Sequence, residues 1–183
     1  MKIRIISTII GMALITGPLW GHSKAIKPGH VDMFLQPYFK MQESLSKDDL
    51  SGAKKHSAMF KEMLGHGPSF DDAPSLSDLS DSAENISNAS SLDEARNAFH
   101  VISKDMSKMV EHVGTSGKHD VFVMSCPMAF KGKGGEWLQH SKQTANPYFG
   151  ASMYGCGSVK TALVENSSKM SEKAHNSHSH KKD

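Results

Sequence analysis

The strongest constraint on the fold is a helical repeat that runs from Ser91 to Gly114. Its apolar residues recur at alternating intervals of three and four, which is the spacing of one buried stripe on an α-helix. Ser91 and Glu94 have the spacing of a capping box, and Gly114 supplies a stop signal. The stripe consists of Leu92, Ala95, Phe99, Ile102, Met106, Met109 and Val113. We therefore predict a helix that forms one seam of a helical bundle.

Three upstream segments show weaker amphipathic patterns, over residues 31–45, 50–64 and 76–86. Pro37 interrupts the first segment, and the third contains many poor helix formers. Four helices with connections of modest length predict an all-α fold, an antiparallel helical bundle. The methionines on these helices are expected to fill the core: Met59, Met63, Met106 and Met109.

The two ends of the chain have different compositions from the middle. Residues 1–25 combine early basic residues with an apolar run and small residues, as a secretory signal peptide does. We expect one domain over residues 26–164, in the periplasm or secreted, with no membrane span after cleavage. Residues 165–183 are polar and predicted to be a disordered tail. Its histidines, His175, His178 and His180, suit either weak metal binding or plain solubility.

Charge excludes one class of function. The chain has 21 Lys and Arg residues and 19 Asp and Glu residues, and the predicted leader removes Lys2, Arg4 and Lys24. The mature chain is then close to neutral, which does not suit a nucleic-acid-binding protein. The histidines on the helices lack the spacing of a zinc helix, so no role is assigned to them: His56, His66, His100 and His112.

Both cysteines lie in the segment that follows the helices. Residues 121–124 and 158–164 are β-prone, and pairing them would bring Cys126 and Cys156 to the same end of a short ribbon. The segment between them would form a loop excursion packed on the bundle. Its aromatic residues would seal this contact: Trp137, Tyr148 and Phe149.

The cysteines and nearby methionines could form a soft sulfur site. An extended strand would place Met124, Cys126 and Met128 on one face, and one helical turn would place Met153 beside Cys156. Thiolate and thioether ligands favour Cu(I). The candidate ligands are Cys126, Met128, Met153 and Cys156, with Met124 in reserve and His119 and His140 as more remote nitrogen donors.

A disulfide is the alternative for the same two cysteines. Paired cysteines are common in oxidising compartments. A Cys126–Cys156 bond would close a loop of about 30 residues and stabilise the fold by roughly 3.5–4 kcal/mol in the chain-entropy model. The residues alone leave both possibilities open, and a reduced pair can bind Cu(I) whereas an oxidised pair cannot.

One ordered series of motifs carries a family resemblance. Cys126-Pro127-Met128-Ala129 is followed by Asn146-Pro147-Tyr148-Phe149-Gly150 and by Met153-Tyr154-Gly155-Cys156-Gly157. Over residues 30–163, this resembles a domain of unknown function found in secreted bacterial proteins and at the C-terminus of CusB-like adaptors of copper and silver efflux systems. Gln139 departs from the expected serine, a change expected to affect only packing.

The resemblance implies a role in handling Cu(I) or Ag(I) outside the cytoplasm. By matching positions it carries over Cys126, Met128, Met153 and Cys156 as metal ligands. Because no long adaptor region precedes the domain, we expect a free-standing protein that sequesters metal or delivers it to an efflux adaptor or pump component. The alternative is a disulfide-stapled interaction module with no metal role. No enzyme signature is recognised, so we do not expect an enzyme.

Overall fold

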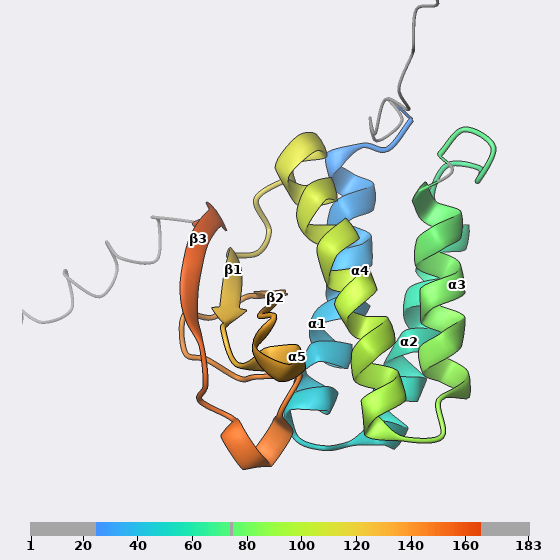
Figure 1. Ribbon diagram of the computed structural model, residues 1–183. Coiled ribbons are helices and arrows are strands. Elements are labelled where there is room, and N and C mark those ends of the chain that lie inside the picture. The colour runs from blue at the N-terminus through green and yellow to red at the C-terminus, as the bar shows by residue number, and fades with distance from the viewer. Residues whose placement is uncertain (1–24, 74, 166–183) are drawn as a thin grey trace, which may run out of the picture.

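Four long helices form the first part of the chain in the computed structural model, which describes residues 25–73 and 75–165 (Figure 1). Their bounds are α1 Pro28–Ser46, α2 Leu50–Gly65, α3 Ser75–Asn88 and α4 Leu92–Val113. Each of the four predicted segments is therefore a helix. Successive helices pack on one another, as in an up-and-down bundle. Apart from Ala25 and Glu165, the predicted leader and the predicted tail lie outside the described residues.

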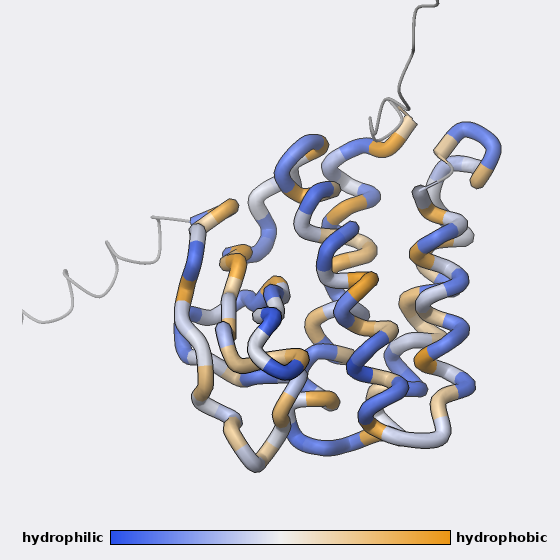
Figure 2. Tube along the Cα trace, in the orientation of Figure 1, coloured by the Kyte–Doolittle hydropathy of each residue, from blue (hydrophilic) through white to orange (hydrophobic). Residues whose placement is uncertain are grey.

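The predicted seam of α4 is buried as expected. Ser91 accepts a hydrogen bond from the Glu94 backbone N–H, and Gly114 ends the helix with a φ of 79°. The five central seam residues are fully buried, while Leu92 and Val113 at the ends are half-buried. Figure 2 shows hydrophobic and hydrophilic positions alternating along each helix, as amphipathic helices require.

Helices α1 and α2 differ from the prediction in detail. Helix α1 begins at Pro28 and continues through Pro37, so Pro37 lies inside the helix and does not interrupt it. Asp49 caps α2, because its side chain accepts from the Gly52 backbone N–H at 2.8 Å. Met59 on α2 is 44% exposed, so the prediction that it fills the core is wrong.

The all-α prediction is wrong, because three strands follow the helices. Strands β1 Val121–Cys126, β2 Gly135–Gln139 and β3 Ser158–Val164 form an antiparallel sheet in the order β2-β1-β3. The pairing of β1 with β3 is the predicted ribbon. The extra strand is β2, whose glycine and short apolar run resemble a turn in the sequence. The fold is a helical bundle with a small sheet beside it.

The sheet meets the helices through the outer edge of β2. The Leu138 backbone N–H donates to the Tyr38 hydroxyl at 2.9 Å, and the Tyr148 hydroxyl donates to the Glu136 carbonyl. Two buried tyrosines therefore satisfy the edge of β2, and β3 lies farthest from the helices (Figure 1). In the part of the chain that the structure describes, no helix has the length and hydropathy of a membrane span.

Two short elements complete the fold. The turn α5 Ala129–Gly132 follows β1 and contains left-handed backbone at Phe130 and Lys131. The 3-10 helix η1 Gly150–Met153 lies between β2 and β3. Both belong to the excursion between the two cysteines, and the last residue of η1, Met153, accepts a hydrogen bond from the Cys156 N–H.

Candidate functional site

The two cysteines meet at one end of the sheet. Cys126 is the last residue of β1, and Cys156 precedes β3. Their Sγ atoms are 2.8 Å apart and form a hydrogen bond, with no disulfide between them. Cys126 is buried, whereas Cys156 is half-buried. The prediction that strand pairing brings these cysteines together is confirmed.

Asn146 holds the backbone around Cys156. Its side-chain amide donates to the Cys156 carbonyl at 2.8 Å, and its own backbone N–H donates to the Tyr154 carbonyl at 2.8 Å. Its side-chain oxygen accepts from the Tyr148 backbone N–H at 2.8 Å. Asn146 is fully buried, so each of these bonds replaces a contact with water. The Asn-Pro-Tyr motif therefore positions the second cysteine.

Arg96 ties the same loop to the helices. Its Nε donates to the Pro147 carbonyl at 2.9 Å, and its Nη2 donates to the Leu45 carbonyl at 3.3 Å and to the Asp48 carboxylate. Asp48 also accepts from the Ala151 backbone N–H at 2.9 Å. One arginine and one aspartate thus join α4, the α1–α2 turn and the start of η1.

Arg96 and Asp48 thus form a clamp on the loop, and a side chain at Gly150 would disrupt this clamp. Gly150 has a φ of 59°, and a Cβ atom there would overlap the Asp48 carboxylate and the Arg96 guanidinium. Glycine is therefore required at this position both for backbone conformation and for space.

The clamp predicts a stability effect at low pH. The Ala151 N–H, followed by Arg96, holds the pKa of Asp48 below its ordinary value of 3.8. This interaction therefore stabilises the fold above about pH 4 and is lost as the pH falls through the lowered pKa. Asp48→Asn should lose more stability at pH 6 than at pH 3, and urea unfolding at both pH values measures this. Asn is suitable because it also tolerates the φ of 58° at this position. An equal loss at both pH values would contradict the assignment.

Gln139 organises the start of the loop. Its side-chain oxygen accepts from Trp137 Nε1 and from the Ala145 N–H, both at 3.1 Å. Its amide donates to the Ser141 carbonyl at 2.8 Å and to the Gln143 carbonyl. Gln139 is only 2% exposed. The expectation that it affects packing alone is therefore too narrow, because it is the hydrogen-bonding centre of this turn.

The candidate methionines have different surroundings. Met124 lies on the buried strand two residues before Cys126, and so on the same face of β1. Met153 is half-buried, and its carbonyl accepts from the Cys156 N–H at 3.0 Å, so the predicted turn is present. Met128 is 57% exposed. The chain leaves the extended conformation after Cys126, so strand alternation does not place Met128 with Met124.

The candidate histidines do not lie beside the thiols. His119 precedes β1 and His140 follows β2, so both lie at the opposite end of the sheet, where their rings pack on Phe39. The length of β1 separates them from Cys126, about 20 Å at 3.3 Å per residue. His175, His178 and His180 lie outside the described residues. Within residues 25–73 and 75–165, no group of three His, Cys, Asp or Glu side chains forms a metal site.

The Cys156 thiol lacks the lowered pKa of an activated nucleophile. The hydrogen bond to Cys126, with burial, raises the pKa of the Cys156 thiol above its ordinary value of 9.0. Reactive cysteines instead have a lowered pKa beside cations or helix N-termini. Any metal that binds here must therefore displace thiol protons, which makes its affinity depend on pH.

The fold and the thiol pair describe a helical domain that carries a small sulfur-containing sheet. Residues 34–118 match a family described as "Protein of unknown function (DUF3347)". The helical part of the chain therefore matches a domain-of-unknown-function family. The match ends before β1, so it does not include the cysteine segment that the predicted resemblance covers. No curated protein and no solved structure matches this chain.

Several residues around the site were not predicted from the sequence. Arg96, Asp48 and Tyr38 act on partners 48 to 100 residues away, and no local pattern signals such contacts. His100, to which no role was assigned, lines a pocket beside β1. Asn146 was part of the motif, but its role in holding Cys156 depends on the folded loop.

Proposed function

We propose that this chain is an extracytoplasmic Cu(I)- or Ag(I)-binding protein whose metal site is built on Cys126 and Cys156. The main support is that the fold brings the two Sγ atoms together, 2.8 Å apart. Met153 lies one turn before Cys156, and Met124 shares the strand face of Cys126. A site of thiolates and thioethers favours Cu(I) over harder ions.

Metal binding requires a small adjustment of the thiol pair. Metal–thiolate bonds of about 2.3 Å in either a linear or a tetrahedral arrangement separate the two sulfur atoms by more than 2.8 Å. Cys156 can supply this movement by rotating its half-buried side chain, while Asn146 holds its backbone. Cys126 is fixed in β1. The strand would therefore provide the rigid ligand and the loop the adjustable one.

The exposure of the sulfur atoms is consistent with transfer of metal to a partner. Cys156 and Met153 are half-buried, and Met128 is exposed. An incoming ligand could therefore approach from the loop side while Cys126 still holds the ion. We propose a heavy-metal efflux adaptor or pump component as the recipient, on the basis of the resemblance, and a periplasmic or secreted location, on the basis of the predicted leader.

A Cu(I) competition titration on the reduced, anaerobic chain tests this proposal. We expect one tight site whose affinity falls at least tenfold in Cys126→Ser. Loss of a residue that only hydrogen-bonds to a metal ligand typically costs tenfold or more, and loss of the ligand itself should cost at least as much. Met153→Leu should also weaken binding. Met59→Leu is the matched control, because Met59 is an exposed methionine on α2. All variants keep the His-rich tail, so any Cu(I) that the tail binds contributes equally to every titration. An affinity unchanged by Cys126→Ser would rule out this site.

A disulfide-stapled interaction module is the second candidate. The same short Sγ–Sγ distance favours it, because a bond of about 2.05 Å would need only a small approach of the two atoms. The outer strand β3 is largely exposed, so it could pair with another chain. Thiol counting on protein purified from its native compartment distinguishes the two candidates. A permanently oxidised pair that resists mild reductant would favour the module.

A further inference from the structure

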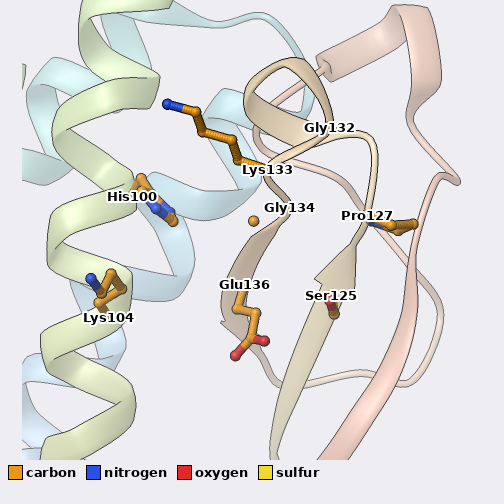
Figure 3. A pocket seen from close by; sticks show the side chains of 9 residues that line it. His100, Lys104, Ser125, Pro127, Gly132, Lys133, Gly134 and Glu136 are labelled. Carbon is orange, nitrogen blue, oxygen red and sulfur yellow. The ribbon is translucent and has the colours of Figure 1, made fainter.

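A pocket of about 550 Å³ lies between α4 and the turn that joins β1 to β2. Figure 3 shows the His100 ring pointing from α4 towards this turn, and Lys133 reaching from the turn back towards α4. Its size falls in the range of small-molecule sites. The lining residues from α4 are His100 and Lys104, and those from β1, the turn and β2 include Ser125, Lys133 and Glu136. No cysteine or methionine lines it, so it is separate from the sulfur site.

The charges around this pocket do not cancel. Glu136 forms an ion pair with Lys160 at 2.6 Å, so its charge is already matched. Within the described residues, Lys104 and Lys133 form no ion pair. Burial, and then Lys104, lower the pKa of His100, so its ring is neutral at pH 7. The pocket therefore presents two unmatched positive charges beside a neutral imidazole.

The turn is shaped by glycine but offers few backbone donors. Gly132 and Gly134 have φ values of 84° and 83°, which a residue with a side chain rarely adopts. Their N–H groups are used inside the turn, at 3.3 Å to the Met128 carbonyl and 3.0 Å to the Ala129 carbonyl. A ligand must therefore be held mainly by side chains. Because the lysine side chains are positively charged, they favour a negatively charged ligand.

We propose that this pocket binds a small oxyanion ligand, one that carries a phosphate or carboxylate group. Lys104 lines the pocket from α4 and Lys133 lines it from the turn, so the two would supply positive charge for the anion. Charge-assisted hydrogen bonds of this kind are stronger than neutral ones. Ser125 and His100 would supply further polar contacts. Because Ser125 precedes Cys126 on β1, the oxyanion site and the sulfur site occupy adjacent positions on one strand. The proposal does not depend on metal binding.

Calorimetric titrations of the full chain with inorganic phosphate and with citrate, at low ionic strength, test the proposal. We expect at least one of these probes to bind at a single site, and Lys104→Gln and Lys133→Gln each to weaken that binding about tenfold. Lys55→Gln on α2 is the matched control, because it removes the same charge but does not line the pocket. Amide NMR should show ligand-induced shifts at residues 132–135, and well-dispersed spectra would show that the variants fold.

Phosphate binding without citrate binding, or the reverse, would support the proposal and identify the ligand group. Binding of neither probe, or binding that both lysine variants retain at the control affinity, would overturn it. Cys126→Ser should leave oxyanion binding unchanged, and the lysine variants should leave Cu(I) binding unchanged. Failure of one site can therefore be distinguished from failure of the other.

Discussion

Trp137→Ala should lower the free energy of unfolding by about 3–5 kcal/mol, the usual cost of removing a large buried aromatic side chain. Trp137 is fully buried on β2, and its ring meets the Tyr148 ring edge to face at a centroid distance of 5.7 Å. Its Nε1 donates to Gln139, and its ring lies beneath Gly157. The Trp137 side chain thus contacts β2, the loop that contains Tyr148, and Gly157, the residue before β3. Urea denaturation followed by circular dichroism measures the loss.

Two further variants make this prediction specific. Phe70→Ala also removes an aromatic ring, but Phe70 is 40% exposed, so it should cost much less. Trp137→Phe keeps a ring on Tyr148 and loses the donor to Gln139, so its cost should be intermediate. Equal effects of Trp137→Ala and Phe70→Ala would contradict the packing described here.

The helices could be predicted from the sequence because their signals are local. The seam of α4 needs only the spacing of its own apolar residues, and its cap needs only Ser91 and Glu94. Strand β2 is different, because its edge is completed by hydroxyl groups of Tyr38 and Tyr148. These partners lie 100 and 12 residues away in the sequence. The glycine-containing run of β2 therefore resembles a turn in the sequence, because the tyrosines that complete its edge are not its neighbours. The all-α prediction was wrong because it missed this strand.

The candidate site shows the same division. The meeting of Cys126 and Cys156 followed from pairing two β-prone runs, which a sequence pattern can indicate. The position of Met128 could not be predicted by alternation, because the strand ends at Cys126. The residues that support the loop are distant in the sequence, and Arg96 is an example, since it sits in an ordinary helical segment. Their contribution depends on tertiary contacts alone.

Arg96→Met should lower the free energy of unfolding by about 2 kcal/mol, because it removes hydrogen bonds to two carbonyl groups and to the Asp48 carboxylate. The cost is below that of a fully buried ion pair because the Asp48 side chain is 37% exposed. The variant should also loosen the loop that carries Cys156, and so weaken Cu(I) binding if the proposed site is correct. Urea unfolding gives the first effect, and the competition titration gives the second.

Lys61→Met is the matched control for Arg96, since it breaks an ion pair of 2.7 Å whose two side chains are 44% and 55% exposed. Exposed pairs contribute little, so its cost should be well below that of Arg96→Met. Arg96→Lys then separates charge from geometry. A lysine keeps the charge near Asp48 but has no planar fork to reach the Pro147 and Leu45 carbonyls together. We therefore expect it to recover only part of the loss. Full recovery would mean that charge, and not the bridging of three chain segments, holds the loop in place.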